Sequence, residues 1–247
     1  MKVIVGVLTV AAAMAVTLES QAALSVFRND VLWDATFEGD VHPSSSTPTW
    51  AGFGGGGPAS GSSDGDIWSQ TTITSSYQYF DQTGSTWTGL GSTRTVEFRA
   101  RVVNQTASDR AFDVIASTGG NAWVVQLSSN GVQLAGSVAI GSVTPIDQST
   151  FHTYRLVMAD FLAQDRAKLY VDNNPIPVSV SGANTPAPFG SATVLSFGDL
   201  STGGVGGTTA MDFISWTNGY FEVPEPSAIV LMGLAGLVLL GRLRRSR

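Results

Sequence analysis

Residues 94–103 read Arg-Thr-Val-Glu-Phe-Arg-Ala-Arg-Val-Val and carry the clearest structural signal in the sequence. Apolar side chains occupy every second position: Val96, Phe98, Ala100 and Val102. Charged side chains occupy the positions between them: Glu97, Arg99 and Arg101. A period of two places successive side chains on opposite faces of a β-strand. The stretch therefore predicts a half-buried antiparallel strand with a charged outer face.

The same alternation recurs along the chain. Residues 122–128 and 166–172 repeat it, and each is followed by turn-forming residues, Asn130-Gly131 and Asp172-Asn173-Asn174-Pro175. Further strands are expected at 31–38, 68–80, 110–117, 132–140, 151–159, 176–180, 193–198 and 210–217. No long segment between the two ends has a helical period, so the sequence predicts an all-β sandwich or barrel.

The first 22 residues have the three parts of a signal peptide. Met1-Lys2 is a short positive region, residues 3–18 are apolar, and Ser20-Gln21-Ala22 supplies small residues before a cleavage site. We expect cleavage after Ala22, with Ala23 as the alternative, and export of the product. The remaining body, residues 23–222, has a length that suits one domain.

Three ordered parts make up residues 223–247. Val223-Pro224-Glu225-Pro226 is extended because proline lacks the N–H that a helix needs. The uncharged apolar run 228–241 predicts a transmembrane helix that anchors the chain in the inner membrane, although its span of about 21 Å is short against a hydrocarbon core of about 30 Å. The arginines that follow are expected to stay in the cytoplasm: Arg242, Arg244, Arg245 and Arg247.

This order of parts resembles the PEP-CTERM sorting signal of Gram-negative, polysaccharide-secreting bacteria. The resemblance implies that an exosortase, a membrane-embedded cysteine transpeptidase-like enzyme, recognises Pro224-Glu225-Pro226. It also implies that the protein reaches the cell surface or the extracellular matrix. The expected signal residues are Val223, Pro224, Glu225, Pro226, Arg242, Arg244 and Arg245. An ordinary C-terminal anchor is the alternative.

The composition excludes several classes of function. The body carries 17 acidic and 8 basic residues, a net charge of −9, which argues against nucleic-acid binding. The absence of cysteine excludes a thiol nucleophile, an iron–sulfur cluster and a thiolate zinc site. With His42 and His152 as the only histidines, a multi-histidine metal site is nearly excluded, and a Ser-His-Asp triad would need one of these two.

A second resemblance rests on three stretches. They are 151–158, Lys168-Leu169-Tyr170-Val171-Asp172 and Ser196-Phe197-Gly198-Asp199. They resemble the second half of concanavalin A-like jelly rolls of the laminin-G and pentraxin type. The resemblance implies an antiparallel jelly-roll β-sandwich in which a closing strand at 210–216 pairs with the first strand near 32–37. The chain departs from the family pattern after Asp172, where the family favours glycine.

Catalysis is not expected. Laminarinase-type glycoside hydrolases share this superfold and need two glutamates on one face of one strand. The body has Glu38, Glu97 and Glu222, and no two of these lie within five residues. Asp34 and Glu38 could share a face, but about 13 Å of strand separates them, more than the roughly 5–9.5 Å that glycosidases use.

Two sets of residues are candidates for ligand binding. Segment 40–92 is rich in Gly, Ser and Thr and is read as loops, yet it carries aromatic residues of a kind that suits stacking against sugar rings: Trp50, Phe53, Trp68, Tyr77, Tyr79, Phe80 and Trp87. The predicted glycan contacts are Trp50, Trp68 and Trp87. The alternative is that these rings cover one sheet of the sandwich. Aspartates in loops and at strand ends could hold Ca²⁺ through hard oxygen ligands: Asp64, Asp66, Asp199 and Asp212.

Three functions therefore remain open. The first is an exported, non-catalytic lectin-like module that binds extracellular polysaccharide. The second is a structural or adhesive protein of the biofilm matrix without a glycan pocket. The third is a glycoside hydrolase with an unusual site, and it is the one the sequence favours least.

Overall fold

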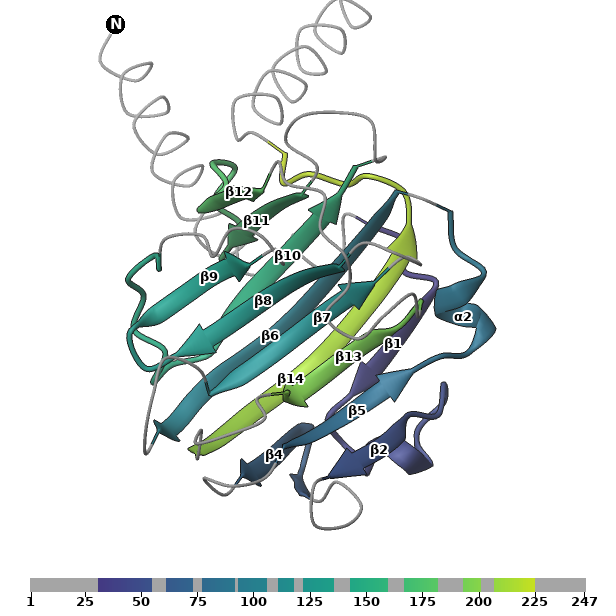
Figure 1. Ribbon diagram of the computed structural model, residues 1–247, viewed down its shortest axis with the longest axis vertical. Coiled ribbons are helices and arrows are strands. Elements are labelled where there is room, and N and C mark those ends of the chain that lie inside the picture. Colours follow the sequence, from purple (N-terminus) through teal and green to yellow (C-terminus); the bar gives the residue numbers. More distant parts are fainter. Residues whose placement is uncertain are drawn as a thin grey trace, which may run out of the picture.

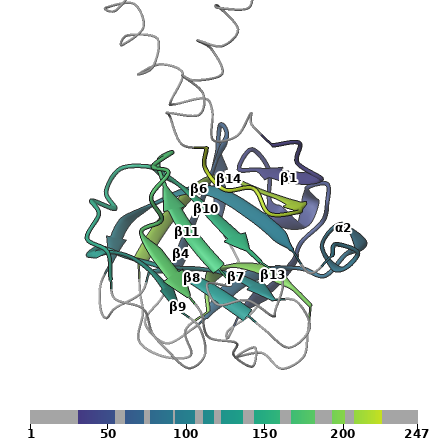
Figure 2. The ribbon, with the colours of Figure 1, turned by 90° about the horizontal axis from the view of Figure 1, so that it is seen from above.

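The computed structural model describes residues 31–54, 61–72, 77–91, 93–105, 111–117, 122–135, 143–159, 167–181, 193–200 and 207–224. The predicted signal peptide 1–22 and the predicted transmembrane run 228–241 lie outside these residues. Over the described parts the chain forms two antiparallel β-sheets that stack face to face (Figures 1 and 2). Within those parts no helix is long and apolar enough to cross a membrane.

The larger sheet has eight strands in the order β12-β11-β10-β6-β14-β4-β3, with β1 also paired to β14. Its members are β1 (Ala35–Glu38), β3 (Ser62–Asp64), β4 (Ile67–Thr72), β6 (Arg94–Gln105), β10 (His152–Met158), β11 (Ala167–Val171), β12 (Ser179–Ser181) and β14 (Gly207–Asn218). One edge of β14 pairs with β6, and its other edge pairs first with β4 and then with β1. The pairs Ala35–Trp216 and Glu38–Phe213 confirm that the closing strand meets the first one.

The smaller sheet has six strands in the order β2-β5-β13-β7-β8-β9. Its members are β2 (Ala51–Gly54), β5 (Gln78–Gln82), β7 (Phe112–Ser117), β8 (Ala122–Ser128), β9 (Gly131–Ala135) and β13 (Leu195–Asp199). A single 3-10 turn, η1 (Pro43–Ser45), and the one-turn helix α2 (Ser85–Thr88) complete the described elements. The arrangement is all-β and consistent with a jelly-roll sandwich.

The core lies between the two sheets and is built from alternate residues of each strand. Val96, Phe98 and Ala100 of β6 are fully buried in it, as the period of two predicts. Trp123 of β8 and Leu169 of β11 approach it from opposite sheets. Stacked sheets lie about 10 Å apart, so one layer of large side chains from each side fills the gap.

Segment 68–80 was predicted to form one strand, and the structure differs from this prediction. It contains two strands, β4 and β5, which belong to different sheets. Trp68 on β4 and Phe80 on β5 meet edge to face across the core, with ring centroids 5.6 Å apart. The loops expected at 40–92 also contain the short strands β2 and β3. No Gly or Pro separates β4 from β5 in the sequence, so the usual signal of a break is missing there.

The predicted turn after β11 takes a conformation that only some residues adopt. Asp172 and Asn173 both have positive φ, 50° and 62°, and the N–H of Asn174 donates to the carbonyl of Val171 at 3.0 Å. Two positive φ angles characterise a type I′ turn, and Asn and Asp tolerate them where most residues do not. The turn after β8 consists of Ser129 and Asn130, one residue earlier than predicted.

The outer face of the larger sheet is also buried along β6 and β10. Glu97 and Arg155 are both 0% exposed, and two Arg155 nitrogens donate to Glu97 Oε2 at 2.8 and 2.7 Å. The prediction that Glu97 lies on a half-exposed charged face is therefore wrong. Its charge is tolerated because a guanidinium group faces it in the neighbouring strand.

Candidate functional site

One row of residues crosses all six strands of the smaller sheet on its outer face. Consecutive members are direct register partners of one another: Phe53, Tyr79, Gly198, Asp113, Gln126 and Gln133. The strand neighbours of these residues face the core, Phe80, Phe197 and Val125 among them. Because side chains alternate along a strand, the row itself points away from the core. We call it the cross-sheet row.

The end of the cross-sheet row at β2 and β5 is aromatic and open to solvent. The Phe53 and Tyr79 rings stack at 5.3 Å between centroids, and Tyr77 lies 5.8 Å from Tyr79. Phe53 is 43% exposed, while both tyrosines are half-buried. Partial burial and the nearby charge of Asp81 raise the pKa of Tyr79, so its hydroxyl keeps its proton and can donate a hydrogen bond.

The other end of the cross-sheet row is polar and shielded. Asp113, Gln126 and Gln133 are only 1%, 6% and 8% exposed. The Gln133 side-chain amide donates to the Gln126 side-chain oxygen. Between the two ends, Gly198 has a φ of 133°, and a Cβ there would lie 2.5 Å from the Gln78 carbonyl oxygen. Only glycine fits at this point, so no side chain separates the aromatic end from the carboxylate.

A second carboxylate lies beside the row. Asp81 follows Tyr79 on the same face of β5, and Ser196 Oγ donates to its Oδ1 at 2.5 Å. Burial raises the pKa of Asp81, and the hydrogen bond from Ser196 lowers it in part. The aromatic end thus borders the Asp81 carboxylate, an acceptor of the kind that holds sugar hydroxyls, while Ser196 itself is buried.

The Asp81 carboxyl makes the stability of the fold depend on pH. Because the pKa of Asp81 is higher in the folded state, the folded protein binds this proton more tightly than the unfolded chain does. The free energy of unfolding therefore falls as pH rises above the ordinary aspartate pKa of about 3.9. We expect Asp81→Asn to raise the urea unfolding midpoint at pH 7 and to leave it unchanged near pH 3. Asp64→Asn, at an exposed turn, is the control and should give no such gain. An equal shift at both pH values would contradict this assignment.

The three tryptophans do not form the expected platform. Trp50, Trp68 and Trp87 are 0%, 1% and 0% exposed, so none can stack against a sugar. Trp50 contacts Trp216 and Phe197 edge to face, at 5.4 and 4.8 Å between centroids. The prediction of an exposed platform at these positions is therefore wrong, and the alternative, that the rings cover a sheet, describes them. All three rings belong to the core cluster, Trp68 from β4, Trp87 from α2 and Trp50 from the position just before β2.

The four aspartates considered for Ca²⁺ lie apart. Asp64 and Asp66 are exposed on either side of Gly65, which has a φ of 59° in the turn between β3 and β4. Asp199 is buried at the end of β13 in the other sheet. Among the described residues, no three acidic or histidine side chains gather where they could hold one ion.

Asp212 has a structural role that its sequence position did not reveal. Met211 and Ile214 both face the core although three positions separate them, and the register of β14 shifts between Met211 and Phe213. This bulge places Asp212 against Arg99 Nη1 at 2.5 Å. An extra residue in one strand bends it and redirects one side chain. The Asp212 carboxylate is therefore occupied by an ion pair.

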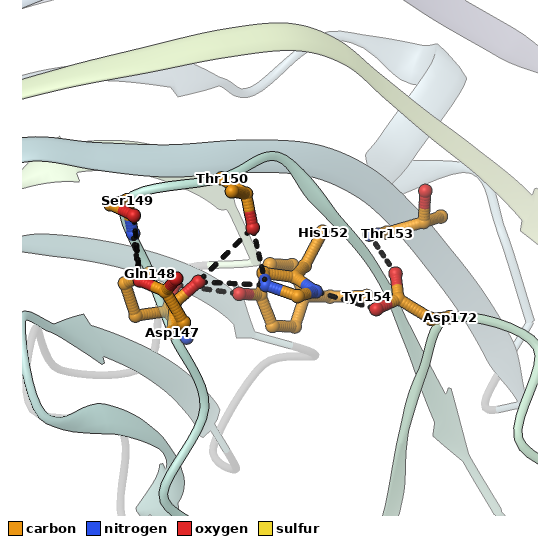
Figure 3. A network of polar contacts seen from close by, with 8 residues as sticks. All are labelled: Asp147, Gln148, Ser149, Thr150, His152, Thr153, Tyr154 and Asp172. Atoms are coloured by element: carbon orange, nitrogen blue, oxygen red, sulfur yellow. Dashed lines mark hydrogen bonds and ion pairs between the residues drawn. The ribbon is translucent and has the colours of Figure 1, made fainter.

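His152 is the centre of a polar network at the start of β10 (Figure 3). Its Nδ1 faces Asp172 Oδ2 at 2.5 Å, and its Nε2 faces the Asp147 carbonyl oxygen at 2.8 Å and Thr150 Oγ1 at 3.1 Å. Asp172 also accepts from the Thr153 N–H at 2.9 Å. Hydrogen bonds from Ser149 lower the pKa of Asp147. The network joins the loop before β10 to the turn after β11.

The geometry of this network favours a clamp over a general base. Both ring nitrogens of His152 face acceptors, Nε2 the Asp147 carbonyl oxygen and Nδ1 the Asp172 carboxylate. A ring held between two acceptors is placed to donate hydrogen bonds rather than to take the proton of the Thr150 hydroxyl. His152, Asp172 and Thr150 therefore come together like a triad but are arranged to tie two chain segments to each other.

Comparison with known proteins identifies one segment of the chain. Residues 222–247 match the family model of the PEP-CTERM protein-sorting motif. The sorting signal predicted from the sequence is thereby confirmed, and the protein is exported with a C-terminal sorting and anchoring signal. Glu222, Val223 and Pro224 are the members of the motif that the structure describes. No curated protein matches the chain in sequence.

Several solved structures align with this chain at low sequence identity. A carbohydrate esterase of the Shiga toxin-encoding bacteriophage phi24B aligns over 76% of this chain and 100% of its own, with a TM-score of 0.53 and 16% identity. A glycosyl hydrolase family protein of Mycobacterium fortuitum gives a TM-score of 0.49 at 15% identity, over 76% of this chain and 100% of its own. The carbohydrate recognition domain of Emp47p gives 0.45 at 14% identity, over 75% and 96%. At 16% identity the likeness to the esterase shows the fold alone.

The cross-sheet row was missed because its members come from six separate strands. Tyr77, Tyr79 and Asp81 do alternate in the sequence around the core residue Phe80, which is a signal of an outward-facing strand surface. Phe53 and Asp113 carry no comparable signal. Their place beside these residues follows from the strand order, which the sequence does not state.

Proposed function

We propose that this protein is an exported, non-catalytic carbohydrate-binding module of the cell surface or matrix. Its glycan contacts begin at the aromatic end of the cross-sheet row. The observation that carries the proposal is the stack of the exposed Phe53 ring on the half-buried Tyr79 ring, beside Tyr77 and the Asp81 carboxylate on one outer sheet face. The sorting motif and the fold shared with a carbohydrate esterase are consistent with it.

Aromatic rings next to hydroxyl and carboxylate groups match the chemistry of a sugar. The C–H face of a pyranose ring packs on the negative face of an aromatic ring, and its hydroxyls need donors and acceptors at the border. Phe53 supplies a ring without a polar group, Tyr79 supplies a ring with a donor, and Asp81 supplies an acceptor. A flat sheet edge of this kind suits a polymer that runs past it.

The charge of the body narrows the polymer class. With a net charge of −9 over residues 23–222, and with carboxylates at Asp81 and Asp113, the face favours neutral or amino sugars. Polymers of uronic acids would be repelled, and this repulsion would weaken as salt screens it. We therefore expect β-glucan, chitin or chitosan to bind in preference to alginate at low salt.

The proposal of a non-catalytic module rests on the spacing of the carboxylates. Asp81 and Asp113 lie on β5 and β7, with β13 between them and an offset of two residues in register. Ladder geometry puts their Cα atoms about 12 Å apart, whereas glycosidase carboxyl groups work at roughly 5–9.5 Å. Glu97 is fully buried against Arg155 and cannot reach a substrate.

Loss of the exposed ring should weaken glycan binding. We expect Phe53→Ala to reduce retention of the detergent-solubilised full chain in affinity electrophoresis by about threefold to tenfold, because a ring stack contributes about 0.5–1.5 kcal/mol. The gels would contain laminarin, chitosan or alginate. Phe221→Ala is the matched control, since that ring is 39% exposed on the opposite sheet and should not affect retention.

The same gels separate the alternatives. A folded protein that no polymer retains would favour a structural or adhesive matrix protein. Release of reducing ends, abolished by Asp113→Asn, would favour a hydrolase. A repeat with chelator tests Ca²⁺, for which Asp64 and Asp66 are the first candidates because both are exposed.

A further inference from the structure

The chain reverses after its last strand and crosses the outer face of the larger sheet. In Figure 1 the yellow end of the described chain turns back at the tip of β14 and runs toward β10 and β11. Gly219 makes the reversal with a φ of 111°, and its N–H donates to the Thr93 carbonyl at 2.9 Å. We call residues 219–224 the strap.

Thr95 holds the beginning of the strap from both sides. Its hydroxyl donates to the Gly219 carbonyl at 2.9 Å and accepts from the Phe221 N–H at 3.1 Å. Thr95 is in register with Val157 on β10, and Val157 is in register with Lys168 on β11. The strap therefore follows one row of the sheet across three strands.

The end of the strap is held by an apolar contact and by a polar one. Val223 is only 6% exposed and packs with Val157 and Tyr170. Lys168 Nζ and the Tyr220 hydroxyl both donate to Glu222 Oε1, at 2.5 and 2.6 Å. Partial burial raises the pKa of Glu222, but these hydrogen bonds outweigh it and hold that pKa below the usual glutamate value.

The strap overlaps the sorting motif. The motif spans residues 222–247, so Glu222 and Val223 belong both to the motif and to the contacts with the body. Only residues 225–227 separate the strap from the apolar run that begins at 228, and three residues span at most about 11 Å. Release of the six-residue strap would add about 20 Å of reach. A processing enzyme in the membrane would then have room for an extended substrate.

We propose that the strap is a latch that keeps the start of the sorting motif on the folded body. The latch slows processing by the membrane-embedded enzyme that recognises the motif. The enzyme needs Val223 and the backbone beside it free of the sheet, and both become free only when the strap lifts away. The Lys168–Glu222 pair and the Val223 contact with Tyr170 set how often that happens.

Lys168 reports the state of the latch because it is the only lysine between residues 23 and 222. The hydrogen bond from Lys168 to Glu222 raises the pKa of Lys168 and so suppresses its reactive, unprotonated form. The full chain would be treated with a succinimidyl ester in detergent, and the modified peptides would be measured by mass spectrometry. We expect Glu222→Gln to label Lys168 about fivefold faster or more, since each pKa unit changes the free amine tenfold. Asp64→Asn, at an exposed carboxylate far from Lys168 in sequence, should not change the rate.

The effect on sorting is tested with a variant that leaves the motif intact. We expect Lys168→Met to shorten the processing half-time about twofold to fivefold in a pulse–chase experiment, in a host that carries the sorting enzyme. Arg99→Met removes another ion pair from the same sheet face and should leave the half-time unchanged. An unchanged labelling rate in Glu222→Gln would overturn the proposal, as would unchanged or slower processing of Lys168→Met.

Discussion

Replacement of Arg155 with leucine is expected to lower the free energy of unfolding by about 3–5 kcal/mol. The change leaves the Glu97 carboxylate buried without its partner, and both side chains are 0% exposed. Removal of one member of a buried pair costs more than the pair itself contributes, because the remaining charge cannot reach water. Urea unfolding followed by circular dichroism at pH 7 measures the loss.

Two further variants separate this cause from the simple loss of a side chain. Arg99→Leu breaks the ion pair with Asp212. The Arg99 side chain is 40% exposed and that of Asp212 is 22% exposed, so the free energy of unfolding should fall by less than about 1 kcal/mol. The double change Glu97→Leu/Arg155→Leu removes both charges and should regain most of the stability. If Arg155→Leu cost no more than Arg99→Leu, the pair would not be buried as described.

Replacement of Trp50 with alanine is the second change with a large expected effect. The ring is fully buried among Trp216, Phe197 and Phe37, so its loss leaves a cavity and should cost about 3–5 kcal/mol. Any variant protein that still folds should bind polysaccharide as the wild type does. Phe53→Ala should weaken polysaccharide binding but lower the free energy of unfolding by less than about 1 kcal/mol, because the Phe53 ring is 43% exposed.

The pair of variants therefore tests which aromatic residues build the core and which face the ligand. Thermal unfolding and affinity electrophoresis on the same samples provide both values. A stable Trp50→Ala protein with weakened binding would restore the tryptophan platform and contradict the burial reported above.

Alternation along single strands was enough to predict most of the sandwich. The period of two at Val96, Phe98 and Ala100 predicts a core strand, and all three side chains are buried in the core. Whether the opposite face is open depends on what lies over it, which is why Glu97 was misjudged. Likewise, the bulge at Asp212 becomes visible only when β14 is set against β6.

The candidate site was harder to predict than the fold. Segment 40–92 contains both the core residue Trp68 and the exposed residue Phe53, and local sequence does not distinguish them. The cross-sheet row joins positions from 53 to 198, so its assembly requires the register of six strands. By contrast, the sorting motif is contiguous, and the sequence alone predicted it correctly.

Glycan binding through the aromatic end of the cross-sheet row is tested by removing both stacked rings at once. Affinity electrophoresis would compare the wild type with Phe53→Ala/Tyr79→Ala across increasing concentrations of the polymer that retains the wild type best. We predict that the double variant migrates almost as it does without polymer, while its unfolding midpoint stays close to that of the wild type. Equal retardation of the two folded proteins would contradict the claim.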